Sequence, residues 1–143
     1  MKKTLLSIAF AFALVSCRAS QWVDSIYLEC QNPTRELFYQ FCCDNSILYP
    51  EVVWAQARLE SGNFRSAMYQ TKNNCLGLYD SRNRRYMSFS HWTECLIAYR
   101  DKVQYRFTGA SDNTEVYLSW LVRIGYASDA DYVSKIRKML RKP

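Results

Sequence analysis

Residues 50–62 read PEVVWAQARLESG, and they predict the short helix around which the rest of the chain is organised. Pro50 stands at the first helical position and Gly62 lies just past the last, which is typical of a helix with these bounds. Glu60 falls in the final turn. The residues three, four and seven positions before it share one helical face: Ala57, Gln56 and Val53. We therefore expect the Glu60 carboxylate on a mostly apolar face directed at the interior.

Two effects should raise the pKa of Glu60 at that position. Burial disfavours the charged form of a carboxylate, and the negative end of the helix dipole disfavours it further. A carboxylic acid that stays partly protonated near neutral pH can protonate the leaving oxygen of a glycosidic bond. The alternative is that Glu60 is a surface residue or an ion-pair partner of Arg58 or Arg65.

Three motifs follow one another along the chain: AQARLESG at residues 55–62, NNCLGL at 73–78 and YASDADY at 126–132. Together they resemble the bacterial glucosaminidase family of peptidoglycan hydrolases, glycoside hydrolase family 73 of the lysozyme-like superfamily. That family typically shows an AQAxLESG helix, an NNLFG turn and a later Y-A-x-D-x-x-Y segment. The resemblance implies a mainly α, lysozyme-like helical domain with a small β-hairpin, and an endo-β-N-acetylglucosaminidase activity on peptidoglycan glycan strands.

The resemblance also implies catalytic roles. Glu60 matches the general acid, which protonates the oxygen between N-acetylglucosamine and the next sugar. The second carboxylate stays open between Asp80, Glu94 and Asp129, and we favour Asp80 because a hairpin facing the Glu60 loop could place it across a cleft. The alternative for Asp80 is a solvated turn residue, and an N-acetyl group of the substrate can replace the second carboxylate. Tyr126 matches the first tyrosine of the last motif, which the family places near the acid.

A further set of residues is predicted to bind the sugar. Asn73 and Asn74 match the NN of the turn, and they either contact glycan or hold the loop by backbone hydrogen bonds, the second role being favoured for Asn74. The family often has tryptophan near the position of Phe64, which we interpret as its replacement. Tyr79, beside the predicted hairpin, completes the set. No cofactor is expected.

Length and composition indicate one folded domain. Of the 143 residues, 49% are hydrophobic and 15% aromatic, with only 4 glycines and 3 prolines. The formal net charge of +6 suits anionic lipid or wall polymer, whereas no basic run is interleaved with aromatic residues as nucleic-acid binding would favour. His91 is the only histidine and there is no CxxC, which disfavours a metal site. We expect a monomer.

The N-terminus predicts export and lipidation. A positive start, MKK, precedes a nearly unbroken apolar run at residues 5–15, and residues 14–17 read LVSC, which looks like a lipobox. The run is too short to span a bilayer permanently. We predict cleavage before Cys17 and a lipid anchor on it that holds the domain at the cell envelope; the alternative is an ordinary signal peptide cleaved nearby. The predicted parts are a signal peptide at 1–17, a tether at 18–31 and a catalytic domain at 32–143.

Five cysteines follow the lipobox, and an oxidising compartment should pair some of them. We predict disulfides between Cys75 and Cys95 and between Cys30 and either Cys42 or Cys43, because each closes a loop between neighbouring elements. Alternatively, the adjacent Cys42 and Cys43 are ordinary core residues. The odd count leaves at least one cysteine outside any intramolecular disulfide.

Hydrophobic period and cap residues predict the remaining elements. The other helices are expected at residues 36–43, 91–106, 113–124 and 130–140. Their expected N-caps include Ser90 and either Ser128 or Asp129. Residues 63–74 read as a loop beside the Glu60 end of the helix, and residues 73–89 permit a small hairpin. We assign Trp92, Val116 and Tyr132 to buried faces.

Two other classes of function stay open. A lysozyme-like domain can bind wall glycan or a partner protein without cleaving it. A Cys/His peptidase or amidase would use His91 as base, and Cys95 lies one helical turn away, although burial is the commoner state of a cysteine in mid-helix.

Overall fold

The computed structural model describes residues 25–109 and 112–141. The chain divides into two units, residues 1–31 and residues 32–143, and the second carries the fold that concerns us. In the first unit, residues 25–28 form one helical turn. The predicted signal peptide, Cys17 and residues 18–24 of the predicted tether lie outside the described residues. Within the described ranges, no helix combines the length and apolarity needed to cross a membrane.

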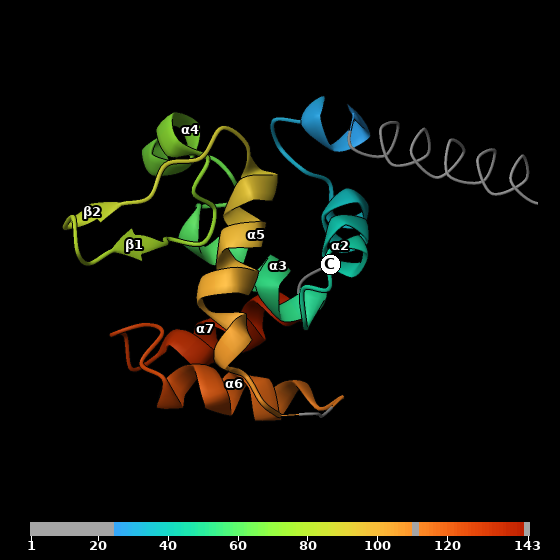
Figure 1. The fold of residues 1–143 in the computed structure, drawn as a ribbon. Helices are drawn as coiled ribbons and strands as arrows, with labels where there is room; N and C mark the ends of the chain where they lie inside the picture. The colour runs from blue at the N-terminus through green and yellow to red at the C-terminus, as the bar shows by residue number, and fades with distance from the viewer. Residues whose placement is uncertain (1–24, 110–111, 142–143) are drawn as a thin grey trace, which may run out of the picture. The chain divides into compact units, whose positions relative to one another are not determined.

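The second unit consists mainly of helices with one antiparallel hairpin (Figure 1). Its elements are α2 (Arg35–Asp44), α3 (Pro50–Glu60), α4 (Ala67–Lys72), β1 (Tyr79–Asp80), β2 (Arg85–Tyr86), α5 (Trp92–Lys102), the 3₁₀ helix η1 (Gln104–Arg106), α6 (Thr114–Arg123) and α7 (Tyr132–Leu140). This architecture confirms the predicted mainly α, lysozyme-like fold with a small hairpin.

Helix α3 lies at the centre of this unit, where it packs against α2 and α7 (Figure 1). It begins at Pro50, as predicted, and ends at Glu60, one residue before the expected end next to Gly62. Its expected inward face is fully buried at Val53, Gln56 and Ala57. A hydrophobic cluster joins α3 to α6 and α7: Val52, Ala55, Tyr117, Leu118, Trp120, Leu121, Tyr132 and Ile136. Burial of this cluster fixes α3 against the two C-terminal helices, and with it the position of Glu60.

The chain reverses immediately after Glu60. The buried Ser61 hydroxyl donates to the Ala57 carbonyl (2.5 Å) and accepts from the backbone N–H of Phe64 (2.8 Å). Residues 62–64 then have φ values of 57°, 55° and 62°, in the left-handed region that ends helices. This capped reversal makes Glu60 the last residue of the helix rather than a residue of a longer one.

The predicted loop at residues 63–74 is corrected by α4, which occupies its second half. Ser66 caps α4 by accepting from the backbone N–H of Tyr69 (3.2 Å), and Tyr69 is fully buried against Phe64. A helix of 6 residues is too short to display an apolar period, so only the cap residue could have indicated it.

The N-caps predicted for the helices now labelled α5 and α7 are wrong. His91, not Ser90, caps α5, and its ring Nδ1 accepts from the backbone N–H of Thr93 (3.4 Å). The N-cap of α7 is Asp131. Asp129 lies in the turn before it, where its carboxylate accepts from the Asp131 N–H (2.9 Å). Each error is within the one or two residues by which helix ends vary.

The predicted buried face of α6 needs one correction. Val116 is 42% exposed, and Tyr117, Leu118 and Leu121 point inward in its place. Trp92 of α5 is fully buried, as predicted.

The described cysteines, Cys30, Cys42, Cys43, Cys75 and Cys95, form no disulfide in the structure, which therefore confirms neither predicted pairing. Cys75 and Cys95 are both fully buried, and the Cys95 thiol donates to Asn74 Oδ1 (3.7 Å). Cys42 is also fully buried, and burial raises the pKa of its thiol. The alternative that both cysteines are core residues holds for Cys42 and fails for Cys43, which is exposed.

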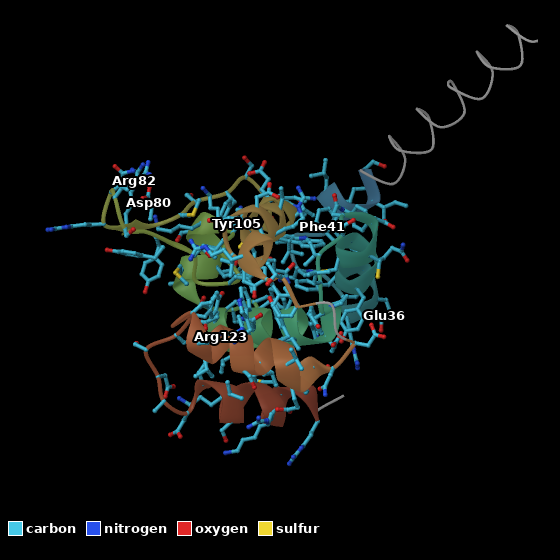
Figure 2. The ribbon with its side chains drawn as sticks, turned by 60° about the horizontal axis from the view of Figure 1, so that its bottom comes forward. Glu36, Phe41, Asp80, Arg82, Tyr105 and Arg123 are labelled. Atoms are coloured by element: carbon cyan, nitrogen blue, oxygen red, sulfur yellow. The ribbon has the colours of Figure 1, made fainter. Side chains whose placement is uncertain are left out.

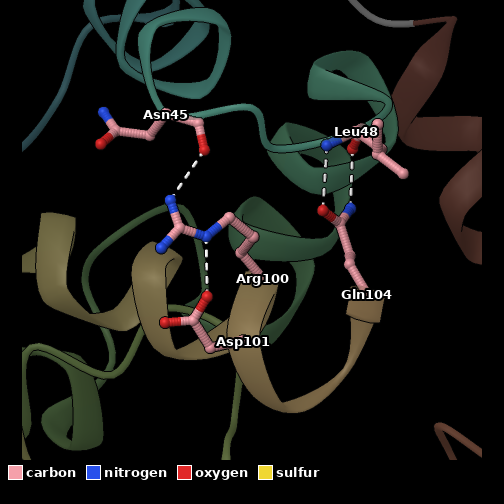
Figure 3. Close-up of polar contacts among 5 residues, drawn as sticks. All are labelled: Asn45, Leu48, Arg100, Asp101 and Gln104. Atoms are coloured by element: carbon pink, nitrogen blue, oxygen red, sulfur yellow. Dashed lines mark hydrogen bonds and ion pairs between the residues drawn. The ribbon is translucent and has the colours of Figure 1, made fainter. Parts of the chain in front are cut away.

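Gln104 ties the start of α3 to the end of α5 (Figure 3). Its Oε1 accepts from the backbone N–H of Leu48 (2.9 Å), and its Nε2 donates to the Leu48 carbonyl (2.7 Å) and to the Tyr117 hydroxyl (2.9 Å). Nearby, Arg100 donates to the Asn45 carbonyl (2.9 Å) and to Asp101 (2.7 Å). Gln104 is only 3% exposed, whereas the Arg100 side chain is partly open to solvent.

We expect Gln104→Ala to lower the free energy of unfolding by about 2–4 kcal/mol, because it leaves buried backbone and hydroxyl groups without their partners. Arg100→Ala removes a partly exposed ion pair and one hydrogen bond to the Asn45 carbonyl, and it should cost less than Gln104→Ala, about 1 kcal/mol. Urea unfolding of the two variants measures both values. Equal losses would contradict the role given to Gln104.

Candidate active site

A groove of about 640 Å³ opens beside the C-terminal end of α3. It is lined by the end of α3, the turn before the hairpin, both strands, the segment after α6 and the start of α7. The lining residues are Leu59, Glu60, Leu76, Gly77, Leu78, Tyr79, Tyr86, Val103, Tyr126, Ala127, Ser128, Asp129, Tyr132 and Lys135. Segments far apart in sequence thus converge on Glu60.

Glu60 is half-buried in this groove, and burial raises the pKa of its carboxyl. A hydrogen bond from the Tyr132 side chain lowers the pKa and so opposes part of that rise. Among the ion pairs of the described residues, none involves Glu60. Arg58, a predicted alternative partner, instead donates to Asn63 (2.9 Å). Glu60 is therefore a partly desolvated carboxyl without a cationic side chain to hold it ionised.

Gly77 packs directly against this carboxyl. It has φ +63°, a backbone conformation that glycine adopts without penalty, and a Cβ placed on it would lie 3.2 Å from Glu60 Oε2. The hydroxyl of Tyr126 donates to the carbonyl of Leu76 (2.9 Å) and so holds the same turn. Burial, together with the nearby Tyr132 and Glu60, raises the pKa of Tyr126. The turn that follows the NN motif therefore forms one wall around the acid.

The hairpin supplies the aromatic part of the groove. Because paired residues share a face of a hairpin, Tyr79 and Tyr86 lie on one side and Asp80 and Arg85 on the other. The two tyrosine rings meet edge to face with centroids 5.2 Å apart, and both remain about half exposed. Tyr79 is thus placed in the groove, together with Tyr86, which no motif in the sequence singles out.

Asp80 lies outside the groove lining, at the end of the hairpin beside Arg82 (Figure 2). Its carboxylate accepts from the Asn83 side chain (2.7 Å) and from the backbone N–H groups of Arg82 (3.1 Å) and Asn83 (3.3 Å). These hydrogen bonds, led by that of the Asn83 side chain, lower the pKa of Asp80. Asp80 thus has the surroundings of a solvated turn residue, which is the alternative to a catalytic role given for it in the sequence analysis.

Of the residues predicted to bind the sugar, three make their contacts within the protein. Asn73 donates to the carbonyls of Phe89 and Ser90, each at 3.0 Å. Fully buried Asn74 holds the turn to the hairpin through the Leu78 backbone, and Phe64 is buried against Trp54. None of the three lines the groove.

The remaining carboxylates differ in their positions. Asp129 lines the groove and forms an ion pair with Lys135, which lowers the pKa of Asp129. Glu94 accepts from the backbone N–H of Ser90 (2.9 Å) at the start of α5 and lies outside the groove lining. His91 and Cys95 do not line the groove either, and both are buried. Within the described residues, no cluster of potential ligands could hold a metal ion.

Comparison with protein families gives a match to the glucosaminidase model, described as mannosyl-glycoprotein endo-β-N-acetylglucosaminidase, over residues 38–143. Searches of curated proteins and of solved structures give no match. The matched residues include α3, the hairpin and both C-terminal segments of the groove. The chain therefore belongs to the glucosaminidase family of glycoside hydrolases, and this membership supports a peptidoglycan hydrolase.

Proposed function

We propose that the chain is an endo-β-N-acetylglucosaminidase that cleaves β-1,4 bonds after N-acetylglucosamine in peptidoglycan, with Glu60 as general acid. The observation that carries this proposal is a carboxyl with a raised pKa, free of ion pairs among the described residues, in the groove of a glucosaminidase-family fold. General acid catalysis typically contributes about 10²–10⁴-fold to a rate.

The proposed reaction begins with transfer of the Glu60 proton to the bridging oxygen as the bond from that oxygen to the sugar C1 breaks. The carbonyl oxygen of the substrate's own N-acetyl group attacks C1, which accounts for the absence of Asp80 from the groove lining. Ionised Asp129 is the carboxylate best placed to stabilise the positive charge that develops. Water then opens the intermediate and returns a proton to Glu60.

Tyr79 and Tyr86 are the proposed sugar-contacting residues. Both rings are about half exposed, and they line the same groove as Glu60. Flat aromatic faces pack well on the apolar faces of sugar rings. We assign them to positioning the glycan against the acid.

Analysis of the products from purified peptidoglycan tests the proposed function. Mass spectrometry should detect new reducing-end N-acetylglucosamine in the digest. New free amines would instead identify an amidase, and binding without any product would identify a wall-binding protein. Either result would contradict the proposal.

We further propose that Cys17 carries a lipid that anchors the domain at the cell envelope, on the basis of the LVSC sequence after the apolar run. Growth with a clickable fatty acid should label the wild-type protein and should not label a Cys17→Ser variant. A wild-type protein that acquires no label would contradict this anchor.

Tyr132 should set the pH range in which Glu60 acts as an acid. Activity requires protonated Glu60, so the rate should fall as the pH rises through its pKa. Tyr132→Phe removes the hydrogen bond that lowers this pKa, so the alkaline fall of kcat should move to higher pH. Tyr105→Phe, at an exposed tyrosine outside the groove lining, is the matched control and should leave the profile unchanged.

A further inference from the structure

A continuous series of hydrogen bonds crosses the core from the backbone of Leu48 to Tyr132, which lines the groove together with Glu60. Gln104 donates to the Tyr117 hydroxyl (2.9 Å), and the hydroxyls of Tyr117 and Tyr99 lie 2.7 Å apart. Tyr99 donates to Gln56 Oε1 (2.9 Å), and Gln56 Nε2 donates to the Tyr132 hydroxyl (3.1 Å). Tyr132 lines the groove beside Glu60, and its side chain lowers the pKa of the Glu60 carboxyl.

The direction of this series is determined at its far end. Leu48 presents both its N–H and its carbonyl to the Gln104 amide, so only one orientation of that amide makes both bonds. In this orientation Nε2 faces Tyr117, whose oxygen must accept. The proton of Tyr117 is then available for Tyr99, and the proton of Tyr99 goes to Gln56 Oε1.

The same reasoning extends to the acid. With Oε1 facing Tyr99, the Gln56 amide must turn Nε2 toward Tyr132, so the Tyr132 oxygen accepts from Gln56. The Tyr132 proton is then left for another acceptor, and Glu60 lines the groove with Tyr132. If the Gln56 amide were reversed, the hydroxyl proton of Tyr117 would have no acceptor in the series, which is costly in a fully buried group. Among the described residues, no buried side-chain nitrogen or oxygen lacks a partner.

We propose that Gln104, Tyr117, Tyr99 and Gln56 are positioning residues that keep the Tyr132 hydroxyl donating to Glu60. None of these four residues lines the groove, whereas Tyr132 and Glu60 do, so the four act on Glu60 through Tyr132. The inference rests on the proposed role of Glu60 as the acid.

Other charged and titratable groups also face Glu60, and the series must be separated from them. Tyr126, Asp129 and Lys135 line the same groove, together with Tyr79 and Tyr86 of the hairpin. Asp129 and Lys135 pair with each other, and Tyr126 donates to a backbone carbonyl. A variant at Tyr117 changes none of these groups, because Tyr117 is fully buried and outside the groove lining.

The test is a pH titration of Glu60 in the full-length protein and its variants. The titration is monitored by carbon-detected NMR of the Glu60 carboxyl group. Tyr117→Phe removes the donor to Tyr99 and lets the Gln56 amide adopt either orientation. The Glu60 midpoint should therefore move to higher pH, by less than in Tyr132→Phe. Tyr69→Phe removes a hydroxyl from another fully buried tyrosine, and it should leave the midpoint unchanged.

If Tyr117→Phe does not fold, Tyr99→Phe releases the same amide and should shift the midpoint in the same direction. A midpoint unmoved in these variants, or moved equally by Tyr69→Phe, would overturn the proposal. The readout does not depend on activity. Retained lysis in a Glu60→Gln variant would refute the proposed function alone, and the titration would still decide whether the series acts on Glu60.

Discussion

Glu60→Gln is expected to abolish lysis of peptidoglycan while leaving the protein folded. Glutamine keeps the shape of the side chain but has no proton to transfer, so the loss should be at least the roughly 10²–10⁴-fold that general acids contribute. Zymography and the rate of reducing-end release measure the effect. Glu36→Gln is the matched control: Glu36 is exposed in the first turn of α2 and outside the groove lining (Figure 2). Wild-type lysis by the Glu60 variant would refute the assignment.

The same variant should keep or raise the melting temperature at neutral pH. Because folding raises the pKa of Glu60, its contribution to stability is present below the ordinary pKa of 4.5 and is lost as the pH rises through the folded pKa. Glutamine does not titrate and avoids this loss. The advantage of the variant should therefore shrink as the pH falls below 4.5. A variant that melts well below the wild type at pH 7 would show that Glu60 has a structural role instead.

Gly77→Ala should damage both stability and activity. The left-handed backbone at φ +63° costs a residue with a Cβ about 1–2 kcal/mol, and the new methyl would lie 3.2 Å from Glu60 Oε2. The carboxylate must then move a little away from the position that it needs for proton transfer. Because a misplacement of about 1 Å can lower a rate by about 10²-fold, we expect this smaller movement to lower kcat by less than that.

Gly125→Ala separates these two effects. Gly125 has φ +65°, and nothing lies within 4 Å of the position that a Cβ would take there. Alanine at this residue therefore carries the same backbone penalty without touching Glu60. Urea unfolding should give similar losses for the two variants, whereas kcat should fall only for Gly77→Ala. Equal kcat values would contradict the close contact between Gly77 and the acid.

The sequence predicts the helix of Glu60 well because the relevant signals are local. Proline at the first position, the reversal at residues 61–62 and the apolar spacing of Val53, Gln56 and Ala57 lie within one short segment. The motifs that frame this helix add the hairpin and the segment after α6. The family match over residues 38–143 agrees with that interpretation.

The surroundings of Glu60 depend on distant residues, and a single sequence cannot pair them. Tyr132 accepts a hydrogen bond from Gln56, which lies 76 residues earlier in the sequence. The hydrophobic spacing predicts correctly that Tyr132 is buried, but it does not predict this hydrogen bond. The register of the hairpin decides that Tyr79 faces the groove while Asp80 faces away. A shift of one residue in that register would exchange the two, and residue propensities do not determine it.

The most direct measurement of the central claim is the titration of the Glu60 carboxyl by carbon-detected NMR in the wild-type protein, compared with the pH dependence of kcat. We expect its midpoint to lie above the ordinary glutamate value of 4.5 and to coincide with the alkaline fall of the rate. A midpoint at or below 4.5, with activity that persists after Glu60 is ionised, would contradict its role as the general acid.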